Sequence, residues 1–174
     1  LQSILNASML VQTGNADAVV AGGVESMSNA EYYTTGARWG GRFGSMTFHD
    51  RLERARETMS PDEPFGHVSG MLETAENLAK KYEIPREEQD EFALRSHQRA
   101  VAAIEGGNFT DEIVPVPVPQ RKGDPVMFDT DEGPRKDTSM ERLAKLQPVL
   151  NEGTVTAGNA SSQNDAAAVC LVVG

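Results

Sequence analysis

Few side chains in this sequence are of the types that carry out nucleophilic or acid–base chemistry. There is one cysteine, Cys170, and there are three histidines, His49, His67 and His97. Cys170 lies in the apolar run 167–173, where a desolvated thiol is a poor nucleophile, so we interpret it as a buried structural residue. The histidines lack the spacing of metal ligands, and we expect surface or supporting roles for them and no metal site.

The glycine-rich segment 36–44 is a second candidate, because its composition suggests a loop that could bind phosphate. It lacks the Lys-Ser/Thr ending of a P-loop and does not directly follow a predicted strand. The surrounding stretch 29–69 is polar, with scattered aromatic residues and repeated glycines. We expect it to be a long loop, and loops of this length in compact proteins tend to be functional or to contact partners.

Composition narrows the class of protein. A chain of 174 residues, with 39% hydrophobic and 24% charged residues, is typical of a globular domain. The net charge of −10 argues against a nucleic-acid partner, and no apolar run approaches the roughly 20 residues that span a bilayer. A single cysteine excludes an internal disulfide and favours a reducing, cytoplasmic location. The apolar start at Leu1 and apolar end near Gly174 predict a piece of a longer protein that exposes faces normally covered.

Apolar periodicity, prolines and glycines predict the elements that must position these residues. Prolines alternate with valines in 113–119, which excludes a central strand and indicates an edge or extended segment. The 85–105 helix should bury an inner face made of Phe92, Ala93, Ser96, Ala100, Ala103 and Ile104. The other predicted elements are a helix over 1–13, a buried strand over 17–21 that ends in a Gly22-Gly23 turn, helices over 71–83 and 142–146, and a buried strand over 166–173. This order is typical of a layered α/β fold.

Three stretches together resemble the thiolase family, the acetyl-CoA acyltransferases. The first, over 20–28, reads Val-Ala-Gly-Gly-Val-Glu-Ser-Met-Ser. The second combines Glu-Thr-Ala-Glu-Asn-Leu-Ala at 73–79 with Arg-Glu-Glu-Gln-Asp at 86–90. The third reads Gly-Thr-Val-Thr-Ala-Gly-Asn-Ala-Ser at 153–161 and is followed by Asn164 and Asp165.

The resemblance implies a fold and an activity. Residues 1–28 and 152–174 would form part of a layered αβαβα core, and 29–151 a mostly helical loop domain that covers a coenzyme A (CoA) tunnel. The parent protein would transfer acyl groups between CoA thioesters, with no permanently bound cofactor, as a homodimer or homotetramer. The family's nucleophilic cysteine falls just before Leu1, and its other catalytic motifs fall beyond Gly174. This piece alone would therefore be inactive.

The resemblance also assigns CoA-binding residues. Ser161 matches a serine that binds the pantetheine arm, Ala157 and Ala160 match small residues beside that arm, and Met71 matches a tunnel-lining methionine. Arg135 matches an arginine near the adenine and phosphate end, a role that suits a planar guanidinium. His67 would lie near the tunnel-lining stretch.

The sequence departs from the family pattern at three positions, where it has Gly70, Leu72 and Ala166 in place of histidine, glycine and glycine. These departures put substrate preference in doubt.

Other interpretations stay open at this stage. Arg135 could be a solvated surface residue, and Ser161 a turn serine bonded to its own backbone. The parent protein could be a non-catalytic carrier of CoA or acyl groups, or the chain could serve mainly in oligomerisation. The position of 36–44 in thiolases suggests oligomer contacts there, with Trp39 and Phe43 as anchors.

Overall fold

The computed structural model describes residues 1–41, 43–58 and 70–174, except for the side chains of residues 56 and 57. The chain forms two compact units, one of Leu1–Ser69 with Gln163–Gly174 and one of Gly70–Ser162. These bounds differ from the division after residues 28 and 151 that the resemblance implies. The assignment of 29–151 as a domain that covers a CoA tunnel stays a prediction.

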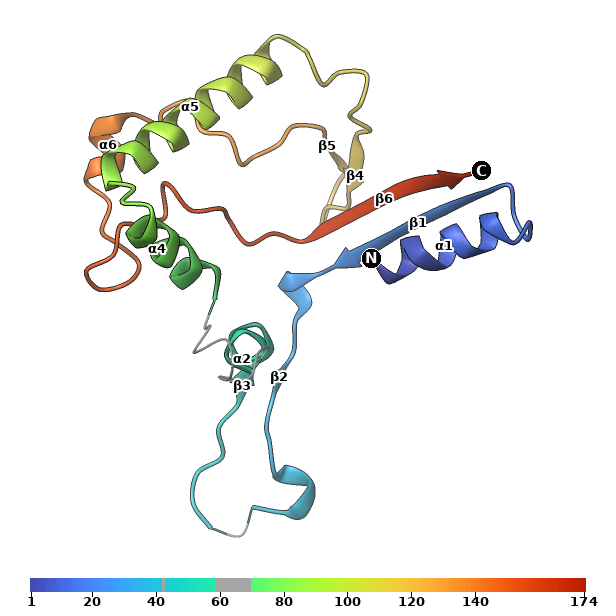
Figure 1. The fold of residues 1–174 in the computed structure, drawn as a ribbon, viewed down its shortest axis with the longest axis horizontal. Helices are drawn as coiled ribbons and strands as arrows, with labels where there is room; N and C mark the ends of the chain where they lie inside the picture. The colour runs from blue at the N-terminus through green and yellow to red at the C-terminus, as the bar shows by residue number, and fades with distance from the viewer. Residues whose placement is uncertain (42, 59–69) are drawn as a thin grey trace. The chain divides into compact units, whose positions relative to one another are not determined.

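The first unit contains a helix packed on a two-stranded sheet (Figure 1). Helix α1 (Gln2–Gln12) packs against strands β1 (Ala18–Glu25) and β6 (Ala166–Val173). The strands are antiparallel, and Ala21 lies opposite Cys170. The helix and both strands predicted from the sequence are confirmed.

The expected turn at Gly22-Gly23 is wrong, because β1 continues through both glycines. They pair with Val169 and Ala168 of β6. A Cβ on Gly22 would lie 2.4 Å from the carbonyl oxygen of Ala168, so the glycine permits close approach of the two strands.

The predicted burial of these strands is also wrong. Among the described residues of this unit, the buried hydrophobic side chains are those of Ala7 and Ala21, and Cys170 is exposed. The physical reason is that α1 is the one helix packed on this sheet among the described elements. Four strand side chains are 65–79% exposed: Val20, Val24, Val169 and Leu171. This exposure agrees with the prediction that the chain displays apolar faces.

The stretch from residue 29 to 58 contains more regular structure than the predicted loop. Strands β2 (Tyr32–Tyr33) and β3 (His49–Asp50) pair antiparallel and lead into helix α2 (Arg51–Thr58). The guanidinium of Arg51 donates to the Glu31 carboxylate at 2.7 Å. The chain also forms the short 3-10 helices η1 (Met27–Asn29) and η2 (Ala37–Trp39). His67 lies outside the described residues.

The second unit is mostly helical. Its elements are α4 (Met71–Lys81), α5 (Arg86–Glu105), β4 (Val116–Val118), β5 (Val126–Phe128) and α6 (Met140–Ala144). Strands β4 and β5 form a two-stranded antiparallel sheet, which confirms that the proline-containing segment is an edge. Helix α6 begins two residues before its predicted start, at a Ser139 cap whose hydroxyl accepts from the backbone N–H of Arg142.

The predicted inner face of α5 is wrong at two positions. Phe92 and Ser96 are exposed, whereas Asp90 is 2% exposed. Asp90 accepts from Arg86 one turn earlier and from Asn159 of the 154–160 turn, so the buried side of α5 carries a charged residue beside the half-buried positions 93 and 97. Within residues 1–41, 43–58 and 70–174, no helix has the length and apolar character needed to cross a membrane.

Candidate functional site

The turn over 154–160 in the second unit is held from one side by Glu76 of α4. The Glu76 carboxylate accepts from the backbone N–H groups of Thr154 and Val155, both at 2.7 Å, and from the Thr154 hydroxyl at 3.0 Å. Burial raises the pKa of Glu76, but these three hydrogen bonds outweigh it and hold the pKa below the ordinary value of 4.5. Glu76 is therefore ionised at neutral pH and fixes the start of the turn.

Asn159 holds the same turn from within. Its side-chain oxygen accepts from the backbone N–H of Thr156 at 2.7 Å, and its amide group donates to the Thr154 carbonyl at 3.2 Å. Thr156 is fully buried, and its hydroxyl accepts from the Gly158 N–H. These bonds present the short side chains of Ala157 and Ala160 on the outside of the turn.

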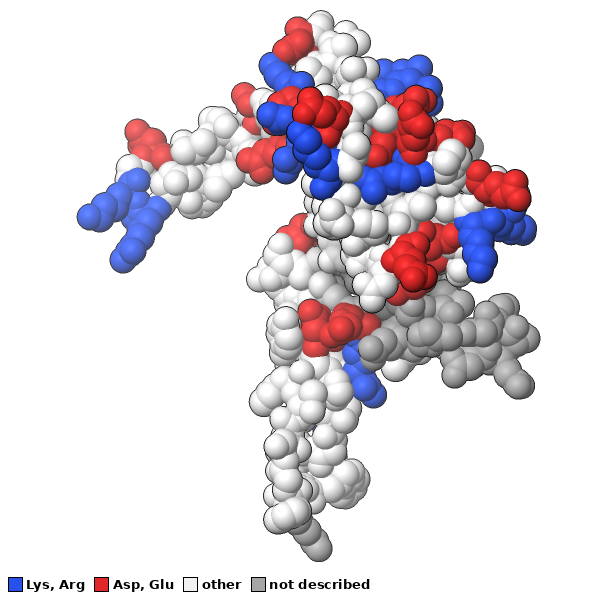
Figure 2. Space-filling model, turned by 90° about the vertical axis from the view of Figure 1, so that its left-hand side faces the viewer, with Lys and Arg blue, Asp and Glu red and all other residues white. Residues whose placement is uncertain are grey.

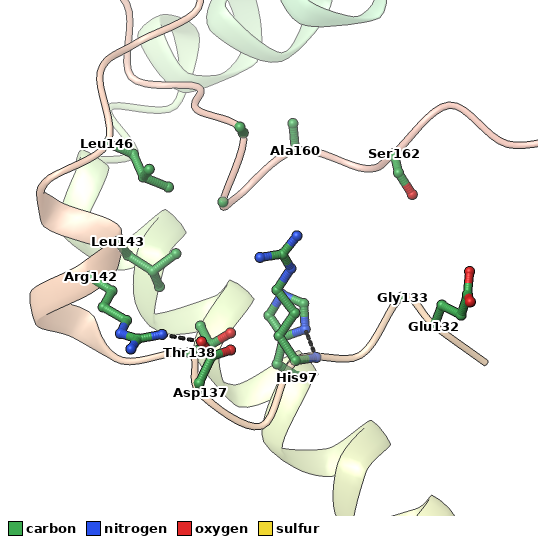
Figure 3. A pocket seen from close by; sticks show the side chains of 13 residues that line it. His97, Glu132, Gly133, Asp137, Thr138, Arg142, Leu143, Leu146, Ala160 and Ser162 are labelled. Carbon is green, nitrogen blue, oxygen red and sulfur yellow. Dashed lines mark hydrogen bonds and ion pairs between the residues drawn. The ribbon is translucent and has the colours of Figure 1, made fainter. Parts of the chain in front are cut away.

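A pocket of about 490 Å³ opens against this turn. Leu143 and Leu146, at and just after α6, form one wall, and the turn itself forms another (Figure 3). The remaining wall comes from His97 of α5 and from the segment that precedes α6. The pocket is thus lined by small and apolar groups on two sides and by charged groups on the third.

The charges of the pocket leave one guanidinium available. Arg142 pairs with Asp137 (dashed line in Figure 3). The side chain of Arg135 lines the pocket and has no ion-pair partner in the described part of the chain. His97 accepts a hydrogen bond at Nδ1 from the backbone N–H of Arg135 at 3.2 Å, which holds that residue at the pocket wall.

Three of the five binding residues predicted from the sequence meet in this pocket: Ala157, Ala160 and Arg135. Ser161 is exposed between two lining residues, and its hydroxyl has no hydrogen-bond partner among the described residues. A turn serine bonded to its own backbone is therefore not what the structure shows. Met71, at the first position of α4, is 77% exposed and does not line the pocket.

Sequence reasoning did not assign two residues that build the pocket. His97, for which a surface or supporting role was expected, is half-buried, lines the pocket and accepts from the backbone N–H of Arg135. Asp90 accepts from the Asn159 amide group at 2.9 Å and was not singled out. The Arg86 and Asp90 spacing of four residues was a signal, but such pairs are common on solvent-facing helix surfaces.

On the side drawn in Figure 2, most Lys and Arg side chains lie beside Asp and Glu side chains. No cluster of His, Cys, Asp and Glu suited to a metal ion occurs among the residues whose structure is described. An anionic ligand would therefore be held by local groups such as Arg135.

Comparison with known proteins gives the family. The model of the family "Thiolase, N-terminal domain" matches residues 1–174, so the chain belongs to the thiolase family. It is 49% identical to an acetyl-CoA acetyltransferase of Pseudomonas aeruginosa and 48% identical to a beta-ketothiolase of Cupriavidus necator, in each case over 99% of this chain.

Solved structures agree. The fold matches the acetyl-CoA acetyltransferase of Bacillus anthracis at a TM-score of 0.82 and 46% identity, over 99% of this chain and 42% of that one. It matches human mitochondrial 3-ketoacyl-CoA thiolase at a TM-score of 0.82 and 39% identity, with the same coverage. The partial thiolase-like α/β fold expected from the sequence is thus confirmed. The chain spans 43% of the length of the two curated relatives.

Proposed function

We propose that this chain is the CoA-binding part of a thiolase that transfers acyl groups between CoA thioesters, by condensation of acetyl-CoA or thiolysis of 3-ketoacyl-CoA. The observation that carries the proposal is the pocket of the helical unit. It combines the guanidinium of Arg135, which has no ion-pair partner among the described residues, with a wall of small residues, Ala157, Gly158 and Ala160. A phosphate-bearing nucleotide joined to a long, narrow arm needs both features.

Each predicted residue has a role in this proposal. Arg135 donates to a phosphate of CoA or stacks on its adenine, and the Ser161 hydroxyl bonds the pantetheine arm. Ala157 and Ala160 have side chains short enough for that arm to lie against the backbone. Met71 lines the tunnel for the acyl group in the assembled protein, a role that rests on the family resemblance alone.

Catalysis requires groups that these 174 residues do not supply. The thiolase mechanism uses a nucleophilic cysteine, a histidine that activates it and a second cysteine that exchanges protons at the substrate α-carbon. Cys170 is exposed in the middle of β6 and no base faces it in the described contacts, so we assign it no catalytic role. We propose that the catalytic groups lie in other parts of a cytoplasmic homodimer or homotetramer, and that this piece alone is inactive. Acyl-CoA is a substrate, not a resident cofactor.

The proposal is tested by calorimetric titration of the full-length protein with CoA. Arg135→Ala should weaken CoA binding about 10- to 100-fold, since a hydrogen bond to a charged group contributes about 1.5–3 kcal/mol. Arg121→Ala is the matched control, because Arg121 is an exposed arginine of the same unit that does not line the pocket. Equal affinity of Arg135→Ala and wild type would contradict the assignment of this pocket.

A non-catalytic carrier of CoA or acyl groups is the alternative. Such a relative would keep the pocket of Arg135, Ala157 and Ala160 without the catalytic groups. Thiolysis of acetoacetyl-CoA by the full-length protein separates the two. A rate that alkylation abolishes establishes the enzyme, and CoA binding without any rate establishes the carrier.

A further inference from the structure

Asp90 is a buried carboxylate that does not line the pocket, yet it is hydrogen-bonded to two residues, Arg86 and Asn159, that contact two of the pocket's walls. It is 2% exposed and lies in the second turn of α5. One oxygen accepts from Arg86 Nε at 2.7 Å, and the other accepts from Asn159 Nδ2 at 2.9 Å. A carboxylate suits this place because it offers acceptors to both donors at once.

On one side, the Asp90 bond fixes the amide of Asn159. That amide cannot turn over, because its oxygen must accept from the Thr156 N–H while its nitrogen donates to Asp90. The backbone N–H groups of Asn159 and Ala160 in turn donate to the Thr156 carbonyl at 3.3 and 3.0 Å. Asp90 therefore determines how the turn presents Ala157 and Ala160 to the pocket.

On the other side, Arg86 reaches the wall that contains α6. Its Nη2 donates to the Leu143 carbonyl at 2.6 Å and to the Leu146 carbonyl at 3.3 Å. The Leu143 carbonyl, near the end of α6, also accepts from the backbone N–H of Leu146 at 3.0 Å, and Leu146 lies two residues beyond the helix. The Arg86 guanidinium thus adds a donor to the carbonyls that follow the helix end. The side chains of both leucines line the pocket.

The two walls also touch directly at Gly158. A Cβ on this glycine would lie 2.5 Å from Leu143 Cδ2 and 2.6 Å from Leu146 Cδ1. The turn and the leucine wall are thus in contact at Gly158, which has no side chain. The hydrogen bonds of Arg86, Asp90 and Asn159 connect the same two walls a second time.

We infer that Arg86, Asp90 and Asn159 are positioning residues that set the width of the pocket for the slender arm of CoA. The inference rests on the proposed function, because it takes CoA as the ligand of this pocket. The three residues do not touch the ligand. They hold the backbone of the two walls at a fixed separation, which a narrow ligand needs for contact on both sides.

The decisive experiment replaces the Asp90 carboxylate by an amide, and then also replaces the Asn159 amide by a carboxylate. In Asp90→Asn the new amide nitrogen must face a donor, either Arg86 or Asn159, so one bond is lost. We expect CoA affinity to fall about tenfold and KM for CoA to rise similarly, with kcat changed less, because the walls shift without touching the reacting atoms. In the double variant D90N/N159D the amide at position 90 can accept from Arg86 and donate to the carboxylate at position 159, so both bonds can form again. The Thr154 carbonyl loses its donor, so we expect part of the affinity to return.

Arg86→Lys provides a second, milder variant. Lysine keeps the charge beside Asp90 but has no fork with which to reach the Leu143 and Leu146 carbonyls, so CoA affinity should fall several-fold. Glu141→Gln is the control, because Glu141 pairs with Lys145 on the exposed side of α6 and should leave affinity unchanged. Affinity is measured by calorimetry on the full-length protein, well below the Tm of each variant.

The outcomes separate the inference from the proposed function. Absence of CoA binding by the wild-type protein overturns both, and loss through Arg135→Ala supports the pocket itself. If wild type binds CoA while Asp90→Asn and Arg86→Lys bind it equally well, the positioning role is wrong and the proposed function stands. If Asp90→Asn does not fold, Arg86→Lys decides, since a purely structural role predicts a lower Tm with unchanged affinity.

Discussion

The unit Gly70–Ser162 buries two polar side chains, Asp90 and Thr156, in a hydrogen-bonded network, although its other described ion pairs are exposed. In the unit of Leu1–Ser69 with Gln163–Gly174, the buried side chains among the described residues are those of alanines, and apolar side chains of the strands are exposed. There Val24 is 79% exposed, and the paired side chains of Glu31 and Arg51 are each more than 60% exposed.

The two units differ in the interactions that fix their conformation. Among the described residues, no buried side-chain nitrogen or oxygen lacks a hydrogen-bond partner, so the polar network around the 154–160 turn is complete. Such a network fixes one conformation of a turn without a large apolar core. The sheet of β1 and β6 instead depends on apolar packing, of which α1 supplies one part.

The largest effect on stability should come from Asp90→Ala. It leaves Arg86 and Asn159 without their acceptor in a buried place, and breaking a buried ion pair costs about 3–5 kcal/mol. Urea denaturation of the full-length protein measures this change in the free energy of unfolding. Glu141→Ala, which breaks an exposed pair with Lys145, should cost under about 1 kcal/mol. Similar costs for the two variants would mean that the buried network is no more important than the surface.

The next effect should come from Glu76→Gln, and it depends on pH. Because the pKa of Glu76 in the folded protein is below 4.5, the stabilisation by its carboxylate is present above pH 4.5 and is lost as the pH falls through the folded pKa. At pH 7 the variant should be less stable by about 1–3 kcal/mol, since a donor loses its acceptor. Between pH 5 and pH 3, roughly, it should lose less stability than wild type. Parallel acid profiles of Tm for the two proteins would show that Glu76 is not the titrating group.

A similar effect on stability, with a clearer effect on binding, is expected from Gly158→Ala. The new methyl would displace the ends of Leu143 and Leu146, at a cost of about 1–3 kcal/mol in a well-packed site. The displaced leucines should narrow the pocket and weaken CoA binding about tenfold. Adding Leu146→Ala restores room and should recover affinity, as measured by calorimetry. No change in affinity for Gly158→Ala would place the ligand elsewhere.

The smallest effect should come from Glu31→Gln in the unit of Leu1–Ser69 with Gln163–Gly174. A hydrogen bond from the Arg51 guanidinium lowers the pKa of Glu31, but both side chains are exposed and solvent screens their interaction. We expect no measurable change in Tm at neutral pH. A loss as large as that of Glu76→Gln would remove the contrast between the two units.

Local signals in the sequence were sufficient for the helices and for the order of the strands. The predicted 85–105 helix agrees with α5, which has Pro85 at its N-cap, Glu87 and Glu88 in its first turn and Gly106 at its C-cap. Alternating prolines correctly marked β4 as an edge strand. These predictions succeeded because caps, breakers and periodicity act within a few residues.

Burial and side-chain networks could not be predicted in the same way. Gly22 was assigned to a turn, although its role is a close approach to Ala168 of a strand more than a hundred residues away. Phe92 was assigned to the core on hydrophobicity, whereas the buried residue is the charged Asp90. Both depend on partners distant in sequence, which local patterns do not encode.

The candidate site was predicted in part. The family resemblance pointed to Arg135, Ala157 and Ala160, which line one pocket. It assigned no role to His97, which lines the same pocket, or to Asn159, which bonds the backbone of the turn. Whether these residues bind CoA stays a prediction.

A crystal structure of the full-length protein with CoA tests the central claim most directly. The proposal predicts the Arg135 guanidinium at about 2.7–3.2 Å from a phosphate oxygen or stacked on the adenine, with the pantetheine arm along the turn and within reach of the Ser161 hydroxyl. CoA bound at another site, with the pocket between the turn and Leu143 filled by solvent, would contradict it.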